Sequence, residues 1–203
     1  MSKVKVQKRE LFIDMTAMSD VTVLLLTFFM LTATFLPKEP IQVITPPSVM
    51  EIKIPDANLL TILVKPDGLV YLNLDRPEDK KAVLDLVSKD YPDMTFSNQQ
   101  LLSFLNQPTI GVPFSVLPRF LDMSLSDQDA YLKQSGVPTD SVNNQLATWI
   151  RYATQVNSDL KIAIKADQET PYPKVQNVIS TLQDLKQNRF NLITTLKGMP
   201  EGY

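Results

Sequence analysis

The sequence predicts a mixed α/β chain in which one N-terminal transmembrane helix is followed by a small exported domain containing a β-hairpin and a strand-helix-strand unit. Three observations lead to this fold class. A single long apolar run occupies residues 17–36, and apolar and polar residues alternate on both sides of a turn at residues 66–68. Near the C-terminus, two segments rich in β-branched residues flank an amphipathic stretch at residues 173–187. These are the periodicities typical of a membrane helix, a hairpin and a crossover unit.

The apolar run is long enough to cross a bilayer. Its only charged side chain is that of Asp20, and at 1.5 Å per residue the run spans about 30 Å, the thickness of a hydrocarbon core. An aspartate at mid-bilayer costs roughly 2.5 to 3.5 kcal/mol on insertion scales, whereas each Leu, Phe, Ile or Val contributes about 0.3 to 0.6 kcal/mol in favour of insertion. The apolar residues from Val21 onward outweigh the aspartate, so we expect the helix to insert.

Asp20 is the candidate functional residue of this helix, because an ionisable group inside a membrane segment is typical of a proton or ion relay. Thr16, Thr27 and Thr34 lie four and seven residues from it or from each other. Seven residues return a helix to within about 20° of the starting direction, so these threonines share a polar face with Asp20. The alternative is a carboxylate near the helix end that reaches the headgroups or is favoured by the helix dipole. We favour proton translocation at Asp20.

The flanks of the apolar run predict its orientation. Residues 1–16 form a basic tail, with Lys3, Lys5, Lys8 and Arg9 against Glu10 in the first ten residues. Short basic flanks stay in the cytoplasm, which places the chain after residue 36 on the exported side. A cleaved signal peptide has an apolar region of only about 7 to 15 residues and a small-residue cleavage site. The longer run here indicates an uncleaved, single-pass anchor.

Composition excludes several classes of site. The net charge is −2 and the chain has neither cysteine nor histidine. No basic field is present for nucleic acid, and disulfides, thiolate zinc sites, cysteine nucleophiles and histidine bases are ruled out. We find no nucleophile elbow and no phosphate loop. We therefore expect no catalytic residue, no metal and no cofactor, and we expect that the protein is not an enzyme.

A proline-rich linker is predicted at residues 37–57. Its prolines, which remove amide donors and favour extended chain, are Pro37, Pro40, Pro46, Pro47 and Pro55. Within it, residues 49–54 alternate between apolar and polar side chains. This stretch is either an edge strand that adds to another sheet or a solvated spacer.

The exported domain is predicted to occupy residues 58–203. Its first part is a hairpin at residues 60–74, followed by a helix at residues 76–91 that covers it. Its last part is a strand at residues 160–167, a helix at residues 173–187 and a strand at residues 190–196. A strand-helix-strand unit of this length usually contains a parallel pair of strands. Asp167 and Tyr172, between these elements, are expected to fix the turn before the helix.

The middle of the domain carries weaker signals. Residues 93–141 are treated as an insertion, in which Ser126 and Asp129 resemble a capping box. The apolar, proline-broken run at residues 110–121 is either core or a docking surface, and core is the more frequent outcome. A helix is predicted at residues 142–156.

The N-terminal string IDMTAMSDVTVLLLTFFMLTATF resembles the anchor of the ExbD/TolR biopolymer-transport family, whose pattern is Ile-Asn-x-Thr-Pro-x-x-Asp followed by leucines and phenylalanines. Ile13, Thr16 and Asp20 match that pattern, whereas Asp14 replaces its asparagine and Ala17 its proline. The resemblance continues in residues 52–57, 64–73 and 164–196, and it leaves out the middle of the chain.

The resemblance implies a subunit of a proton-driven motor in a bacterial inner membrane, with its C-terminal domain in the periplasm. The implied partners are an ExbB/TolQ-like polytopic protein, a TonB/TolA-like energy-transducing protein and a second copy of the chain in a homodimer. The work done would be outer-membrane transport of the TonB type or envelope maintenance of the Tol type. The competing hypothesis is a bitopic scaffold, in which the helix anchors a periplasmic interaction module and Asp20 only pairs with a neighbour. A flagellar-type stator also carries a membrane aspartate, but we see no peptidoglycan-binding domain of the expected kind.

Overall fold

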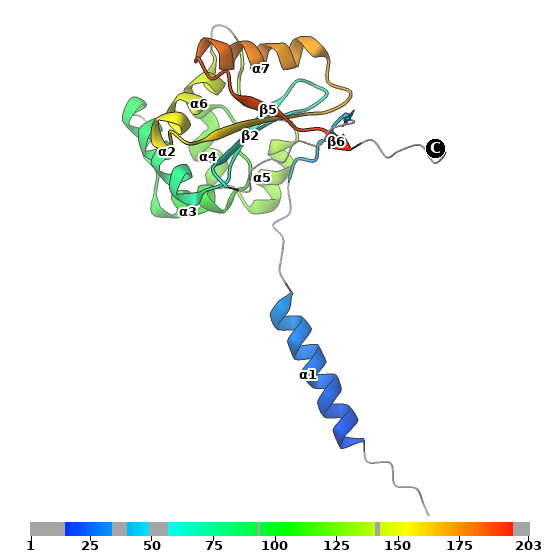
Figure 1. Ribbon diagram of the computed structural model, residues 1–203. Coiled ribbons are helices and arrows are strands. Elements are labelled where there is room, and N and C mark those ends of the chain that lie inside the picture. The colour runs from blue at the N-terminus through cyan, green and yellow to red at the C-terminus, as the bar shows by residue number, and fades with distance from the viewer. Residues whose placement is uncertain (1–14, 34–39, 49–56, 93, 141–142, 197–203) are drawn as a thin grey trace, which may run out of the picture. The chain divides into compact units, whose positions relative to one another are not determined.

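The chain forms two units, residues 1–38 and residues 39–203 (Figure 1). The computed structural model describes residues 15–33, 40–48, 57–92, 94–140 and 143–196. Mixed α and β structure is confirmed, and every strand among the described residues belongs to the second unit. That unit begins inside the segment that the sequence assigns to the linker.

The first unit contains helix α1, Thr16–Thr32. Leucine, methionine and alanine favour this conformation, and Thr22, Thr27 and Thr32 satisfy their hydroxyls on carbonyls of the same helix. The helix ends at Ala33, which has extended backbone. The sequence predicted that the helix extends to residue 36, but residues 34–36 lie outside the described part of the chain. Nowhere in the described ranges does a helix combine the length and the hydropathy that a membrane crossing requires.

A four-stranded sheet in the order β3-β2-β4-β5 organises the second unit. Its strands are β2 (Leu59–Val64), β3 (Val70–Leu74), β4 (Lys161–Ala166) and β5 (Phe190–Leu192). Strands β2 and β3 are antiparallel, and Gly68, with φ of +85°, supplies the left-handed backbone that their turn needs. The predicted hairpin is thus confirmed, as is the parallel pairing of β4 with β5.

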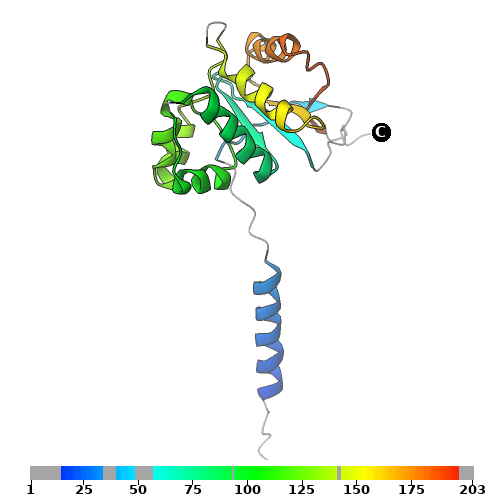
Figure 2. The same cartoon turned by 90° about the vertical axis from the view of Figure 1, so that its left-hand side faces the viewer.

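Alternation along the strands creates the main core. Leu60 pairs with Ile162 and Ile62 with Ile164 across the parallel β2-β4 ladder, and all four side chains are buried. Amphipathic helices cover this face of the sheet (Figure 2): α2 (Pro77–Asp90), α6 (Gln145–Val156) and α7 (Tyr172–Asp184). These correspond to the predicted helices at residues 76–91, 142–156 and 173–187. Helix α6 begins later than predicted because Asn144 caps it, accepting a hydrogen bond from the backbone N–H of Ala147.

The prediction of one strand over residues 190–196 was wrong, because the segment is divided between two sheets. After β5, the N–H of Ile193 still bonds the carbonyl of Ile164, but Thr195–Leu196 forms strand β6 in a second sheet. Strand β6 pairs in parallel with β1, Pro47–Ser48. The strand considered for residues 49–54 lies outside the described residues.

The insertion at residues 93–141 is largely helical and packs beside the edge strand β3. It contains α3 (Asn98–Asn106), the 3-10 helix η1 (Phe114–Val116), α4 (Leu117–Leu121) and α5 (Leu125–Leu132). Leu72 and Ile110 exchange backbone hydrogen bonds of 2.8 and 2.7 Å, and Val137 donates to the carbonyl of Val70. The run at residues 110–121 contributes to the core, as the sequence favoured, with the following side chains buried: Ile110, Val112, Phe114, Leu117, Phe120 and Leu121.

The predicted cap at Ser126 was wrong. Helix α5 begins two residues earlier, with Ser124 as its N-cap: the Ser124 hydroxyl accepts from the N–H of Asp127 at 3.3 Å. The same hydroxyl lies 2.7 Å from an oxygen of the Asp127 carboxylate, to which it donates. The spacing of Ser124 and Asp127 is the same as that of Ser126 and Asp129, so the pattern matched both positions and only the helix start distinguishes them.

Candidate functional site

Helix α1 presents Asp20 on an otherwise uncharged surface. The helix sequence contains no other charged residue, and none of its side chains is buried. Among the described residues, Asp20 makes no hydrogen bond and no ion pair. Three and four residues after Asp20 on the helix, Val23 and Leu24 are 57% and 62% exposed. Asp20 is thus the one charged group among the exposed apolar side chains of α1.

Three threonine hydroxyls on α1 are satisfied by their own helix. Thr22, Thr27 and Thr32 donate to the carbonyls of Met18, Leu24 and Phe28 at 2.7, 2.9 and 2.8 Å. Because a hydroxyl oxygen keeps its acceptor capacity while it donates, Thr27 remains able to receive a hydrogen bond on the Asp20 face. Thr16 is the first residue of α1, and Thr34 of the predicted polar face lies outside the described residues. The helix therefore offers one titratable carboxyl and at least one hydroxyl acceptor a helical repeat away.

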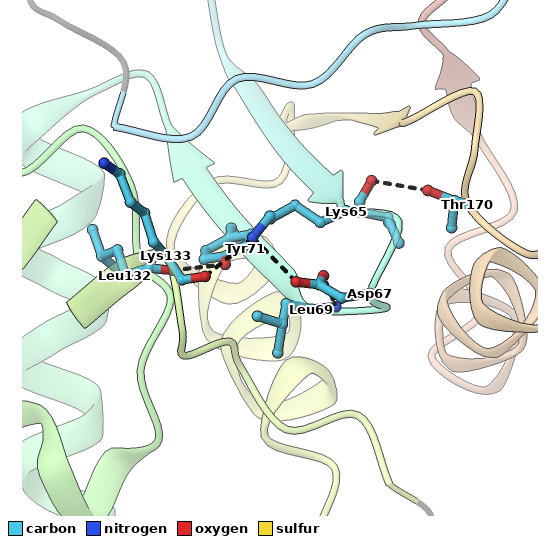
Figure 3. Close-up of polar contacts among 8 residues, drawn as sticks. Lys65, Asp67, Leu69, Tyr71, Leu132, Lys133 and Thr170 are labelled. Atoms are coloured by element: carbon cyan, nitrogen blue, oxygen red, sulfur yellow. Dashed lines mark hydrogen bonds and ion pairs between the residues drawn. The ribbon is translucent and has the colours of Figure 1, made fainter. Parts of the chain in front are cut away.

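A second polar cluster lies at the hairpin turn of the folded unit (Figure 3). The ammonium group of Lys65 donates to a carboxylate oxygen of Asp67 at 3.2 Å and to the carbonyl of Lys133 at 3.1 Å. The other oxygen of Asp67 accepts from the N–H of Leu69 at 3.2 Å. Each of these contacts fastens the turn or joins it to the insertion, so the cluster is structural.

Tyr71 extends this connection into the interior. Its hydroxyl donates to the carbonyl of Leu132 at 2.7 Å. Burial, with a smaller contribution from the charge of Asp67, raises the pKa of Tyr71 above its ordinary value. The hydroxyl is thus a neutral hydrogen-bond donor, and it is unsuited to proton transfer near neutral pH.

Asp167 follows β4 directly, and Tyr172 is at the start of α7, so the two residues flank the turn in which the sequence placed them. One oxygen of the Asp167 carboxylate accepts from the N–H of Glu169 at 3.1 Å, which confirms its expected role in the turn. The other oxygen accepts from the N–H of Ile44 at 3.0 Å, a contact that sequence reasoning missed. Tyr172 is the first residue of α7 and is 70% exposed.

Two buried charged residues were also missed. Lys80 is 6% exposed and donates to the carbonyl of Gln107 at 2.9 Å. Burial lowers its pKa, and the nearby charge of Asp75 opposes that effect only in part. Its neighbour Asp79 accepts from the side-chain amide of Asn157 at 2.9 Å. The charged run at the start of α2 is typical of a solvated first turn, so nothing in the sequence marked either residue as buried.

The described part of the chain holds no group of three or more acidic, histidine or cysteine side chains suited to a metal ion. Neither a curated protein nor a solved structure shows a significant match to the chain. A family model does match, and it covers residues 7–197, which include the helix with Asp20, the insertion and the sheet. On that match, nearly the full length of the sequence, the chain belongs to the ExbD/TolR family of biopolymer transport proteins.

Proposed function

We propose that this protein is the anchor-bearing subunit of a motor driven by the proton-motive force, with residues 17–36 as its membrane segment and Asp20 as its proton carrier. The observation that carries the proposal is the single carboxyl of α1 in a chain of the ExbD/TolR family. The proposal involves no enzymatic step and no cofactor. The coarser role, a membrane-associated component of biopolymer transport, follows from the family itself.

The physical basis of the proposal is the surroundings that α1 requires. Its exposed apolar side chains favour a shell of lipid and neighbouring helices, in which Asp20 would be shielded from water. Shielding disfavours the ionised carboxylate, so the group takes up a proton there and releases it when its surroundings become polar. Thr27, one helical repeat away, provides a hydroxyl oxygen on the same face.

The energy available per proton is sufficient for such a device. A potential of 100 mV is worth about 2.3 kcal/mol per elementary charge. That free energy changes a two-state equilibrium by a factor of roughly 50. Neutralising and recharging Asp20 therefore biases the position of α1 against its neighbours between two arrangements.

The proposed partners are the helices that surround α1 and the protein on which the motor does work. An ExbB/TolQ-like polytopic protein would surround the helices of two copies of this chain, and a TonB/TolA-like protein would carry the work outward. We place the chain in a bacterial inner membrane as a single-pass protein, with the basic residues 1–16 in the cytoplasm and the folded unit in the periplasm. The work is either outer-membrane transport or envelope maintenance.

The substitution Asp20→Asn tests the proposal. The amide has nearly the same shape as the carboxyl but does not titrate, so energised transport should be lost while the protein still co-purifies with its polytopic partner. Asp20→Glu, which keeps a titratable group, is the matched control and should retain part of the activity. If Asp20→Asn keeps full activity, the helix is only an anchor and the chain is a scaffold for a periplasmic interaction module.

A further inference from the structure

Residues 40–48, which we call the strap, lie on the face of the sheet opposite to α2, α6 and α7: Ile41 of this segment lies near Thr61 and Leu63, which alternate along β2 with the core residues Leu60 and Ile62. Ile41 and Val43 are buried, at 3% and 8% exposure, while Gln42 and Ile44 between and after them are exposed. This period of two is that of an extended chain with one row of side chains turned toward the domain. The strap is also the part of the folded unit nearest in sequence to helix α1.

Ile44 is held entirely through its backbone. Its N–H donates to the Asp167 carboxylate at 3.0 Å, and its carbonyl accepts from the N–H of Gln168 at 2.9 Å. The side chain of Ile44 is 67% exposed and adds little to the attachment. The two oxygens of the Asp167 carboxylate therefore have different partners: one accepts from the N–H of Ile44 in the strap, and the other accepts from the N–H of Glu169 in the turn.

Beyond Ile44 the attachment is short. Pro46 and Pro47 have no amide donor, and strand β1 pairs with β6 over only two residues on each side. Thr45 and Ser48 also interact with their surroundings, but only two apolar side chains of the strap are buried, and these contacts together have to offset the entropy of ordering the segment. Such a segment opens at a lower free energy than the strands of the core.

The strap also leaves space beneath it. A cavity of about 170 Å³ is lined by Ile41 of the strap and by sheet and loop residues that include Thr61, Leu63, Asn73, Thr109 and Ile193. Several of the lining side chains are polar, so this space can hold water rather than the close-packed apolar contacts of a core. The strap thus covers this face of the sheet without sealing it.

We propose that the strap is a conformational device that alternates between a docked and a released state, and that the bond from Ile44 to Asp167 holds it docked. Release uncovers the face of the sheet that carries Thr61, Leu63 and Asn73. Because the strap is the first described segment of the folded unit after α1, a pull on the anchor acts on Ile41, Val43 and this bond before it acts on the strands of the four-stranded sheet. The proposal goes beyond the proton-carrying role of Asp20 and does not depend on it.

Asp167→Asn tests the bond selectively. The asparagine oxygen can still accept from Glu169, as in the Asx turns common for this residue, but its NH₂ group then faces the N–H of Ile44. Amide hydrogen exchange of Ile44 in the full chain should rise on the order of tenfold. Asp67→Asn is the control, because Asp67 makes the same turn contact at Leu69, and its other oxygen accepts from Lys65 rather than from the strap.

A second pair of variants leaves Asp167 intact. Ile44→Pro removes the N–H donor, whereas Ile44→Ala keeps it and shortens only an exposed side chain. Exchange at Gln168, whose N–H bonds the carbonyl of Ile44, should increase in the proline variant and stay at the wild-type rate in the alanine variant. Equal exchange in all of these variants and the wild type would overturn the proposal.

Uncovering of the sheet face is measured with a single thiol. The chain has no cysteine, so Thr61→Cys introduces the only one, on the covered face. Its reaction with N-ethylmaleimide should be on the order of tenfold faster in an Asp167→Asn background than in an Asp67→Asn background. The same rate in both backgrounds would show that the face is not uncovered by loss of the bond, and the proposal would fail.

Discussion

The hydroxyl of Tyr71 and the carbonyl of Leu132 join the edge strand of the sheet to the insertion, at 2.7 Å and across 61 residues of sequence. Tyr71 is fully buried on β3, and Leu132 is the last residue of α5. The backbone bonds between Leu72 and Ile110 lie next to this contact. The insertion is therefore an integral part of the domain, and it occupies the edge of β3 that would otherwise be open to another strand.

Tyr71→Phe should destabilise the domain by about 1 to 3 kcal/mol, because it leaves the buried carbonyl of Leu132 without its donor. Denaturant unfolding of the full chain, followed by fluorescence, measures the change. The chain has one tryptophan, the buried Trp149, so the signal reports the folded unit alone. An unchanged midpoint would mean that the hydroxyl contributes nothing to holding the insertion.

Gly111→Ala should be among the most damaging single-methyl changes in the domain. A Cβ at this position would collide with the ring of Tyr71, which is itself fully buried and cannot move aside. We expect a loss of about 2 kcal/mol or more, as for overpacked cores. Gly68→Ala is the comparison: its Cβ would meet the flexible side chain of Lys174, and the cost should be nearer the roughly 1 kcal/mol of a left-handed alanine. Equal losses for the two variants would contradict this steric account.

Ser124→Ala should cost about 0.5 to 2 kcal/mol, because the hydroxyl of Ser124 caps α5. Ser126→Ala, two residues later and inside the helix, should change the unfolding free energy by less than about 0.5 kcal/mol. Unfolding curves of the two variants, measured side by side, assign the cap. A larger effect at Ser126 would restore the cap that the sequence pattern suggested.

Tyr152 makes alkaline stability depend on pH. Its hydroxyl donates to Asp90, and burial together with that hydrogen bond raises the pKa of Tyr152 to about 12. A tyrosine with a raised folded pKa stabilises the fold fully below the ordinary value of about 10, and this contribution is lost as the pH rises toward 12. Tyr152→Phe should therefore be less stable at pH 8 by about 1 to 2 kcal/mol, and it should lose less stability than the wild type between pH 10 and 12. Parallel pH curves for the two proteins would contradict the assignment.

The elements with strong periodicity could be predicted from the sequence. The hairpin, the β4-α7-β5 unit and the helix after the hairpin were all recognised from alternation or helical spacing, since apolar residues recur at the strand or helix period in each. The division of residues 190–196 into two strands could not be predicted from the sequence. Strand β5 pairs with β4 but β6 pairs with β1, and this change of partner depends on where the strap lies. No local pattern encodes that position.

The insertion and the polar contacts were less predictable for a similar reason. Its helices are short, and α3 begins at a capping box of Ser97 and Gln100 that local analysis passed over. The hydrogen bond that Lys80 donates to the carbonyl of Gln107 joins residues 27 positions apart, and the bond from Ile44 to Asp167 joins residues 123 positions apart. Such contacts are fixed by the tertiary fold. The role of Asp20, by contrast, rests on the chemistry of one residue in an apolar helix, and it stays a prediction.

Proton movement through the reconstituted complex is the most direct test of that role. The chain would be co-reconstituted into liposomes with its polytopic partner, and proton uptake would be followed with an internal pH dye under an imposed membrane potential. We expect uptake with the wild type, reduced uptake with Asp20→Glu and none with Asp20→Asn. Uptake by Asp20→Asn at the wild-type rate would contradict the assignment of Asp20 as the proton carrier.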